Sequence, residues 1–437
     1  MERNKSVALI TLGCKVNIAE TEGMKLLFQK AGYTVVPEDQ YADVYVINTC
    51  TVTGMGDKKS RQMIRRAHTL NPDAIVAAVG CFAQVSPEET AKIEGVTLVL
   101  GNNMKHRIVE IVEDSKNKEK KQYVFERKAL SDYEQLPVET YEGHTRAFLK
   151  VQDGCDQFCS YCIIPYARGP IRSREIRDVI DEAKSFAGHG FKEVVLTGIH
   201  LTSYFDKKNG KGLAELIREI HEVDGIERIR LGSLEPMFLT SEFIEGIKNL
   251  PKLCPHFHLS LQSGCGETLK RMNRRYTPDE YKNIVMLLRE KIPNVTFTTD
   301  VMVGFPGETE EEFEQSYAFC REIGFMWMHV FKYSPRKGTP AAKFHDQVDP
   351  KTKEIRSKRM IELAERMRNE TYESFKGWET DVLVEKPIEG KEGYMEGLTP
   401  NYIPVAVEIK REKTGEIIDI RLISCEGEYM RGELKLN

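Results

Sequence analysis

The 437-residue sequence contains no long uninterrupted hydrophobic run. Its first residues, Met-Glu-Arg-Asn-Lys, are followed by only a short apolar segment, VALITLGC, so we expect neither a secretory signal peptide nor a membrane-spanning helix. The composition of a disordered tail is also lacking, because hydrophobic residues make up 41% and charged residues 30% of the chain. The sequence therefore predicts a cytoplasmic globular protein that is long enough for two or three domains.

A basic excess is lacking as well, since the formal net charge is −4. A protein with this charge does not bind polyanions through its overall field, and any such contact must come from local patches. The basic segments are KKSRQMIRRAH (58–68), RGPIRSREIR (168–177) and KRMNRR (270–275). Each segment alone is most typical of a solvated surface, so only its position relative to a reactive centre would make it functional.

A fourth metal ligand is missing from the segment DGCDQFCSYCIIP (153–165), which places Cys155, Cys159 and Cys162 in the spacing Cys-x3-Cys-x2-Cys. In a reducing cytoplasm, clustered cysteines are expected to bind metal rather than to form disulfides. A structural zinc ion needs four ligands, and the fourth would have to be a distant residue such as His144 or His200. A cubane iron–sulfur cluster has four irons to hold, so three thiolates would leave one iron without a protein ligand.

Short apolar strands alternate with helical patterns in residues 1–115, which predicts an open parallel sheet with helices on both faces. Cys14, Cys50 and Cys81 each follow one of the first three predicted strands. Because the carboxyl ends of parallel strands lie along one edge, the sequence predicts a second site with three cysteines there. The alternative is that these cysteines are small buried hydrophobic residues.

The rest of the chain is predicted to form a linker and two further domains. Residues 116–140 are polar and charged, which is typical of a linker. In residues 141–372, six strands alternate with helices, which predicts a parallel sheet curled into a partial βα barrel with its site at the carboxyl ends of the strands. Residues 373–437 contain short strands and glycine-rich turns, which predict a small all-β barrel. The expected fold class is therefore α/β with an added carboxy-terminal β-barrel.

The cysteine spacing after the first strand of a βα barrel resembles that of the radical S-adenosylmethionine enzymes. The resemblance implies that Cys155, Cys159 and Cys162 hold a 4Fe-4S cluster whose open iron binds S-adenosylmethionine, the source of a 5′-deoxyadenosyl radical. Polar residues at strand ends, and the glycine-rich segment VGFPGETEEEF (303–313), are the candidate contacts to S-adenosylmethionine. These candidates are Ser233, Glu235, Gln262, Asp300 and Gly304.

Over essentially the whole chain, the order of domains resembles that of the methylthiotransferases, whose carboxy-terminal β-barrel is called TRAM. This resemblance implies a second 4Fe-4S cluster on Cys14, Cys50 and Cys81 that carries the sulfur to be transferred. S-adenosylmethionine would then be both the methyl donor and the radical source, and a low-potential electron donor would be a partner. A non-catalytic iron–sulfur sensor and a radical enzyme that modifies a protein are the alternatives.

The motifs TLGCKVNIAET (11–21) and NTCTVTGMGDKKSRQMIRR (48–66) resemble those of methylthiotransferases that act on threonylcarbamoyladenosine in tRNA. The resemblance implies transfer of a methylthio group to C2 of this base at position 37 of tRNA. The alternatives are isopentenyladenosine in tRNA, whose enzymes typically show Gln-Met after the first cysteine, and an aspartate of a ribosomal protein. Basic side chains near the clusters would grip the anticodon stem-loop through its phosphates. The expected contacts are Lys58, Lys59, Arg61, Arg65, Arg66, Arg168, Arg172 and Arg174.

Overall fold

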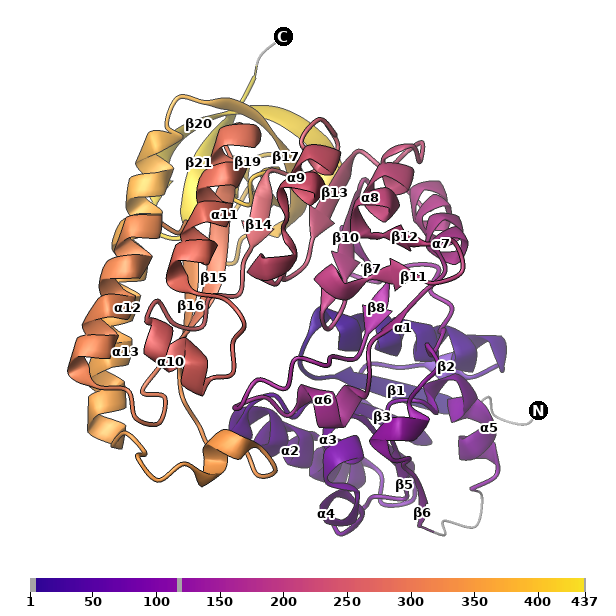
Figure 1. Cartoon of the computed structure of the whole chain (residues 1–437). Coiled ribbons are helices and arrows are strands. Elements are labelled where there is room, and N and C mark those ends of the chain that lie inside the picture. The colour runs from indigo at the N-terminus through magenta and orange to yellow at the C-terminus, as the bar shows by residue number, and fades with distance from the viewer. Residues whose placement is uncertain (1–4, 116–119, 436–437) are drawn as a thin grey trace.

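The computed structural model describes residues 5–115 and 120–435, which form three parts in chain order (Figure 1). The first part, the amino-terminal sheet, is a parallel sheet of six strands in the order β2-β1-β3-β4-β5-β6. Its strands are β1 (Ser6–Thr11), β2 (Thr34–Val35), β3 (Val44–Thr49), β4 (Ile75–Gly80), β5 (Leu98–Leu100) and β6 (Lys121–Tyr123). Its helices are α1 (Lys15–Lys30), α2 (Gly54–Leu70), α3 (Cys81–Val85), α4 (Pro87–Ala91) and α5 (Ile108–Glu113). The predicted parallel sheet with flanking helices is confirmed.

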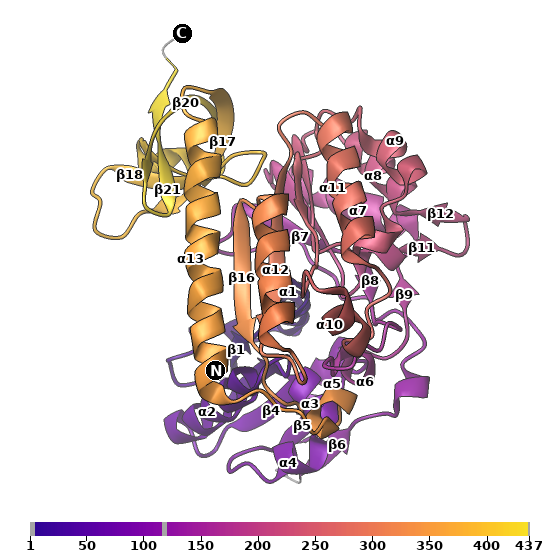
Figure 2. The ribbon, with the colours of Figure 1, turned by 60° about the vertical axis from the view of Figure 1, so that its left-hand side comes forward.

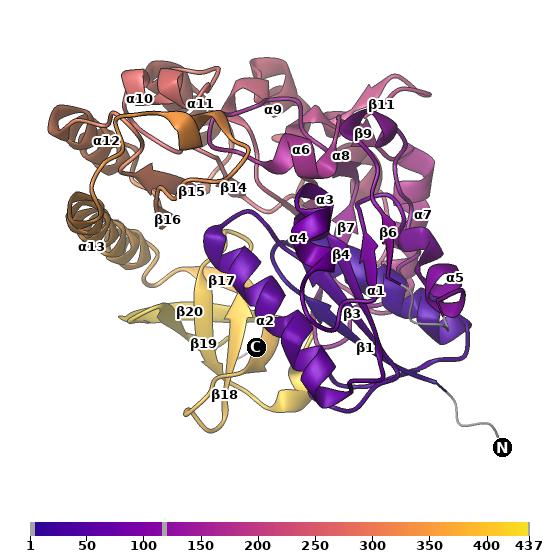
Figure 3. The same ribbon diagram turned by 90° about the horizontal axis from the view of Figure 1, so that it is seen from below.

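Burial on both faces explains why these strands form a parallel sheet. All six residues of β3 are buried, and apolar runs of this kind are typical of strands covered on both sides. Ile64 of α2 and Phe82 of α3 belong to the core on one face, whereas Phe28 of α1 and Ile111 of α5 belong to the core on the other. Figure 3 shows α2 and α5 on opposite sides of the sheet.

The sheet extends beyond the boundary that the sequence predicts at residue 115. Lys121–Tyr123 pairs with β5 in parallel, and Leu130 and Leu136 further along are buried. The prediction of a linker over 116–140 is therefore wrong for this strand and for these anchored residues. A polar edge strand of three residues is too short to show the period of two that identifies a strand in a sequence.

The second part, the central barrel, consists of two parallel sheets in the orders β7-β10-β13 and β14-β15-β16. Isolated bridges, Ile229 to Leu253 and Leu234 to Leu259, join the two sheets. The strands are β7 (Arg146–Lys150), β10 (Glu193–Thr197), β13 (Arg228–Leu231), β14 (His256–His258), β15 (Thr296–Val303) and β16 (Trp327–Lys332). Because β7 and β16 remain at the two outer edges and do not pair with each other, the barrel is open on one side, and the predicted partial βα barrel is confirmed.

Helices cover the outside of the central barrel, and short elements surround its mouth. The covering helices are α7 (Ile176–Gly188), α8 (Leu213–His221), α9 (Ser241–Ile247), α11 (Pro278–Lys291) and α12 (Glu310–Ile323). The short elements are β8 (Gln152–Asp153), α6 (Ile164–Arg168), β9 (Arg172–Ser173), β11 (Phe205–Asp206), β12 (Lys211–Gly212) and α10 (Gly266–Arg271).

The third part, the carboxy-terminal barrel, is closed by five strands in the order β17-β18-β19-β21-β20, which confirms the predicted all-β barrel. The strands are β17 (Glu379–Pro387), β18 (Tyr394–Leu398), β19 (Pro404–Glu408), β20 (Ile417–Glu426) and β21 (Tyr429–Leu434). The long helix α13 (Pro350–Ser374) leads from the central barrel to this part along one side of the molecule (Figure 2).

Arg228 of β13 holds the carboxy-terminal barrel against the central barrel. Its Nη1 donates to the carbonyl oxygen of Leu398 at 2.8 Å, and its Nη2 pairs with Asp381 at 2.7 Å. The small barrel therefore sits at the end of the central barrel where the strands begin. In the described ranges, no helix combines the length and the apolar character that crossing a membrane requires.

Candidate functional site

The amino-terminal cysteines come together at one edge of the sheet, as the sequence predicts. Cys14 follows β1, Cys50 follows β3 and Cys81 follows β4, and these three strands are neighbours in the sheet. Burial raises the pKa of the Cys50 thiol to about 11, and the charges of Cys81 and Cys14 add to this effect. The loops after β1 and β3 also approach closely, since a Cβ at Gly13 would lie 2.8 Å from Cys50 Sγ. Thiols of this kind lose their protons when a metal binds them.

Arg168 at the end of α6 contacts the amino-terminal cysteines from the central barrel. Its Nε donates to Cys81 Sγ at 3.2 Å, and its Nη1 lies 3.3 Å from Asp153. The guanidinium also pairs with Glu20 of α1, and the side chain is completely buried. A buried cation beside thiols favours their thiolate form, which is the form that binds metal.

The prediction that Arg168, Arg172 and Arg174 contact tRNA is wrong. Their exposed fractions are 0%, 5% and 5%, so none of them reaches a phosphate of a bound nucleic acid. Arg172 pairs with Asp153 at 3.3 Å, and Arg174 pairs with Glu182 at 2.8 Å. The physical reason is that carboxylates buried between the two parts need cationic partners, and this basic segment supplies them.

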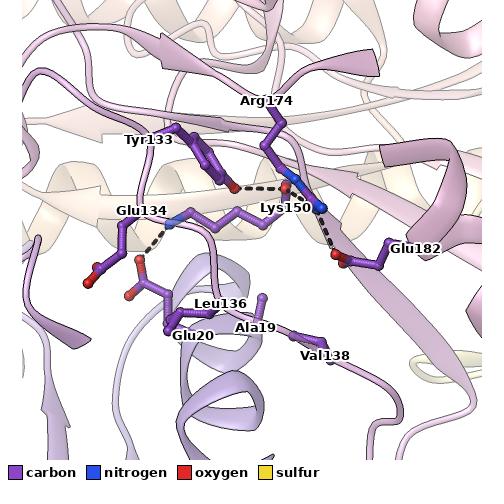
Figure 4. Close-up of a pocket in the computed structure, with 9 residues that line it drawn as sticks. All are labelled: Ala19, Glu20, Tyr133, Glu134, Leu136, Val138, Lys150, Arg174 and Glu182. Atoms are coloured by element: carbon purple, nitrogen blue, oxygen red, sulfur yellow. Dashed lines mark hydrogen bonds and ion pairs between the residues drawn. The ribbon is translucent and has the colours of Figure 1, made fainter. Parts of the chain in front are cut away.

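Figure 4 shows the junction where these buried charges meet. Lys150 of β7 donates from Nζ to Glu20 at 2.7 Å, and the Tyr133 hydroxyl donates to the carbonyl oxygen of Lys150 at 2.8 Å. The space between the side chains is about 20 Å³, which is room for a single water molecule. The junction is therefore a packed ionic network rather than a ligand site, and it fixes α1 against the first strand of the central barrel.

The second cysteine set lies on the loop between β8 and α6, at the mouth of the central barrel. Burial raises the pKa of Cys155 to about 11 and that of Cys162 to about 12. Arg274 donates from Nη1 to Cys159 Sγ at 3.5 Å, and its side chain is almost fully buried. Each cysteine set therefore has three thiols and one buried guanidinium.

The arrangement of the cysteines differs from the compact ligand group of a single metal ion. Among residues 5–115 and 120–435, no three His, Cys, Asp or Glu side chains converge closely enough to hold one ion. The cysteines of a cubane each bind a different iron, so their sulfurs stand farther apart. Gly13 has a φ of +100°, and a Cβ there would lie 2.8 Å from Cys50 Sγ, so the approach of these two loops depends on glycine.

The histidines of the zinc alternative do not complete a site of four ligands. His144 precedes β7, at the opposite end of this strand from the cysteine loop, and its ring packs edge-on against Phe148. His200 follows β10 near the mouth of the barrel, and its ring packs edge-on against Phe238. Burial, with a smaller effect of Arg274, lowers the pKa of His200 to about 4, so this ring is neutral.

Of the predicted contacts to S-adenosylmethionine, Glu235 lies nearest to the second cysteine set. It pairs with Arg274 at 2.8 Å, and Arg274 in turn contacts Cys159. Burial raises the pKa of Glu235, although Arg274 opposes this shift. Gln262 has a left-handed backbone with φ of 67°, which is rare for a residue with a side chain and is often found at functional sites.

Gly304 has an explanation in the fold itself. Its φ is +69°, and a Cβ at this position would lie 2.3 Å from Cγ of Lys353 on α13. Its N–H donates to Glu308 at 2.8 Å. The glycine is therefore required by the packing of α13, and a role toward a cofactor stays a prediction.

A cavity of about 500 Å³ occupies the interior of the central barrel and reaches the carboxy-terminal barrel. Ser233 and Asp300, two of the predicted contacts to S-adenosylmethionine, line it. The cavity wall also includes Lys15, Arg146, Arg230, His256, His258, Trp327, His329, Glu385, Glu396 and Tyr402. Lys15, which directly follows Cys14 in the sequence, is the residue of α1 among those that line the cavity.

Several residues of the site were missed by sequence reasoning. Arg274 follows α10 and was noted only as part of a basic segment, Lys15 begins α1 and stood only within a quoted motif, and Arg146 begins β7 without any motif. His200 is 7% exposed, and in the described part of the chain both its ring nitrogens lack a hydrogen-bond partner. A buried histidine without partners is atypical, so His200 is a further candidate contact to a bound group at the barrel mouth.

Comparisons with known proteins agree with this site. The model of the Radical SAM superfamily matches residues 149–320, and that of the Uncharacterized protein family UPF0004 matches residues 6–101. The threonylcarbamoyladenosine tRNA methylthiotransferase MtaB of Bacillus subtilis is 40% identical over 98% of this chain and 96% of its own. That of Aquifex aeolicus is 43% identical over 94% of this chain and 98% of its own. The tRNA-2-methylthio-N(6)-dimethylallyladenosine synthase of Alkaliphilus oremlandii is 34% identical over 99% of this chain and 93% of its own.

Among solved structures, the radical S-adenosylmethionine methyltransferase TsrM of Kitasatospora setae has a similar fold. The TM-score is 0.59 at 16% sequence identity, with 78% of this chain and 75% of TsrM covered. This likeness supports the fold alone, whereas the full-length relatives at 34% identity and above define the family. The chain therefore belongs to the radical S-adenosylmethionine methylthiotransferases.

Proposed function

We propose that this enzyme acts in the cytoplasm and transfers a methylthio group to C2 of threonylcarbamoyladenosine at position 37 of tRNA. The observation that carries the proposal is the pair of separate three-cysteine sets, each with its own buried arginine, Arg168 and Arg274. We assign one 4Fe-4S cluster to Cys14, Cys50 and Cys81 and the other to Cys155, Cys159 and Cys162. When bound, the clusters and S-adenosylmethionine supply the sulfur, the methyl group, the electron and the radical that an inert aromatic C–H bond requires.

The residues of the chain would bind, orient and shield the reacting groups. Arg168 and Arg274 place a positive charge beside each set of thiolates and neutralise part of their negative charge. Ser233, Glu235, Gln262 and Asp300 remain our candidate contacts to S-adenosylmethionine, and we add His200 to them.

The choice of substrate rests on the named relatives. Those named for threonylcarbamoyladenosine are 36–43% identical to this chain. Those named for dimethylallyladenosine are 33–34% identical, so this base is the second candidate. Nothing in the structure favours an aspartate of a ribosomal protein. An unidentified low-potential electron donor would complete the system.

The test uses the enzyme reconstituted anaerobically with iron and sulfide. It is incubated with S-adenosylmethionine, dithionite and anticodon stem-loop RNAs that carry either threonylcarbamoyladenosine or dimethylallyladenosine. Mass spectrometry of the digested nucleosides should find the methylthio product from the first RNA. Formation of 5′-deoxyadenosine without any methylthio product, or a product only from the second RNA, would refute the proposed substrate. A non-catalytic sensor would form no 5′-deoxyadenosine.

A further inference from the structure

The wall of the barrel cavity carries an ammonium group without a counter-charge. Lys15 forms no ion pair in the part of the chain that the structure describes. The charged groups that act on it most strongly are Arg146 and Arg230, both of which line the same cavity. Three cations thus line one cavity, and two of them are paired with carboxylates, Arg146 with Glu385 and Arg230 with Glu193.

Arg146 offers a second free donor in the cavity. Its Nε pairs with Glu385 at 2.7 Å, but its Nη1 is buried without a hydrogen-bond partner in the described residues. Arg230, in contrast, is fully used, because it donates to both oxygens of Glu193 and to the carbonyl oxygens of Thr399 and Pro400. Lys15 and Arg146 are therefore the cations of this wall that can bind a ligand.

The carboxylates that line the cavity neutralise Arg146 but form no ion pair with Lys15 in the described residues. Glu385 is occupied by Arg146, and Glu396 lies 3.4 Å from Lys386. Asp300 lies 3.4 Å from His258 on the wall formed by β14 and β15. Burial lowers the pKa values of His256 and His329, so these rings are neutral near pH 7. The wall formed by Lys15 and Arg146 lacks one negative charge.

We infer that Lys15 and Arg146 bind the threonyl carboxylate of the substrate base in this cavity and so select threonylcarbamoyladenosine over uncharged modified adenosines. This inference rests on the proposed function. An ammonium and a guanidinium together are well suited to a carboxylate, with which they form charge-assisted hydrogen bonds. The cavity of about 500 Å³ has the size of a site for a small ligand. A neutral dimethylallyl group would leave the Lys15 ammonium without a counter-charge and the Arg146 Nη1 without an acceptor, and unpaired donors in a binding site disfavour the wrong ligand.

The position of the cavity suits a base that reacts near the clusters. Lys15 directly follows Cys14, and Ser233 and Asp300, two predicted contacts to S-adenosylmethionine, line the same cavity. Tyr402 stacks on His256 with ring centres 4.3 Å apart, and it gives the cavity a flat side. A base displaced from its stack could thus place its amino acid group against Lys15.

The test compares two chemically matched ligands on the full-length reconstituted enzyme. Anticodon stem-loop RNAs carry threonylcarbamoyladenosine with either a free threonyl carboxylate or its methyl ester, and binding is measured by fluorescence anisotropy at constant salt. The wild-type enzyme should bind the acid roughly 10- to 100-fold more tightly than the ester, as expected for a charge-assisted contact. If the cations instead bind a tRNA phosphate or the carboxylate of S-adenosylmethionine, acid and ester will bind equally, and the inference is wrong.

A double variant, Lys15→Met with Arg146→Gln, assigns the effect to these residues. The double variant should bind the acid RNA and the ester RNA with affinities within about twofold of each other. Its affinity for the ester RNA should equal that of the wild type. Lys30→Met is the matched control, because Lys30 is an exposed lysine at the other end of the same helix and should keep the full difference. The iron content of each variant shows whether its iron–sulfur sites are filled. A double variant that still distinguishes acid from ester would overturn the assignment.

The two proposals can fail separately. If the wild-type enzyme converts only the dimethylallyladenosine RNA, the proposed substrate is wrong and the carboxylate site falls with it. If the enzyme converts the threonylcarbamoyladenosine RNA but binds acid and ester equally, the proposed function stands and the carboxylate site alone is refuted.

Discussion

Arg168 of the central barrel donates a hydrogen bond of 3.2 Å from Nε to Sγ of Cys81 in the amino-terminal sheet. The same guanidinium binds Glu20 on α1 and Asp153 at the base of the second cysteine loop. One buried side chain therefore contacts the first cysteine set and the segment that positions the second. The relative placement of the two sets depends on a tertiary contact rather than on either part alone.

Replacing Arg168 should damage both stability and the amino-terminal cluster. Arg168→Met leaves Glu20 and Asp153 with fewer cations, and loss of one partner from a buried ionic group destabilises a protein by about 3–5 kcal/mol. Urea unfolding under anaerobic conditions measures this change. Arg177→Met is the matched control, because Arg177 has a side chain that is 86% exposed and should change stability by less than about 1 kcal/mol. Equal stability of the two variants would show that Arg168 does not hold the junction.

Iron content tests the two separate cysteine sets. We expect about eight irons per chain after reconstitution, since each cubane holds four. Changing Cys155, Cys159 and Cys162 to Ala should leave about half of this iron. Changing Cys14, Cys50 and Cys81 to Ala should also leave about half, and this variant should still cleave S-adenosylmethionine but form no methylthio product. A triple variant that keeps all its iron, or a folded one that loses all of it, contradicts the assignment.

The positions of the six cysteines could be predicted because they follow from local patterns. Cys14, Cys50 and Cys81 stand after apolar strands that alternate with helices, and parallel strands bring such positions to one edge. The closed carboxy-terminal barrel was predictable for a similar reason, since its short strands are separated by glycine-rich turns. Periodicity and turns are properties of neighbouring residues, so a sequence reveals them.

The environment of the cysteines could not be predicted in the same way. Arg168 was assigned to tRNA because its segment is basic, but its partners Glu20 and Cys81 are far away in the sequence. Lys15 stands in the motif TLGCKVNIAET, which resembles that of enzymes acting on threonylcarbamoyladenosine but gives no role to Lys15 itself. Its place on the cavity wall depends on how α1 packs against β7. Charge compensation in a buried junction is a tertiary property, and no local pattern reports it.

Stability should depend on the protonation of His106 at the edge of the junction. Its ring lies 3.0 Å from Glu134, and this hydrogen bond raises the pKa of His106. A pKa that is higher in the folded than in the unfolded state means that the protonated ring stabilises the fold. This contribution is fully present at pH values below the unfolded pKa of about 6.5, and it is lost as the pH rises through the folded pKa. Because the side chain is 48% exposed, the effect should stay below about 1 kcal/mol.

The comparison of wild type with His106→Gln isolates this contribution. Urea unfolding between pH 6 and about pH 8 should show the wild type losing more stability than the variant as the pH rises. NMR of the His106 ring should place its pKa above 6.5, the ordinary value. Parallel stability curves for the two proteins would exclude a role for the pair with Glu134.

The exposed side of α2 is our remaining candidate for binding tRNA phosphates. Lys58, Lys59, Arg65 and Arg66 are exposed, and none of them forms an ion pair within the described ranges. Arg61 differs from this group, because it pairs with Glu89 at 3.1 Å and lies over the ring of Phe82 at 4.8 Å. The structure therefore divides the predicted contacts on this helix into four free cations and one that is already partnered.

This division gives a prediction with an internal control. Changing Lys58, Lys59, Arg65 and Arg66 to Gln should weaken tRNA binding and reduce the slope of log affinity against log salt by about three to four units, because each lost phosphate contact removes roughly one released counterion. Arg61→Gln should change this slope by less than about one unit, since its charge is already balanced by Glu89. Cleavage of S-adenosylmethionine without tRNA should be unchanged in both variants, because the second cysteine set lies in the central barrel. An unchanged slope in the fourfold variant would mean that α2 faces only solvent, and phosphate binding would then have to come from other surfaces of the molecule.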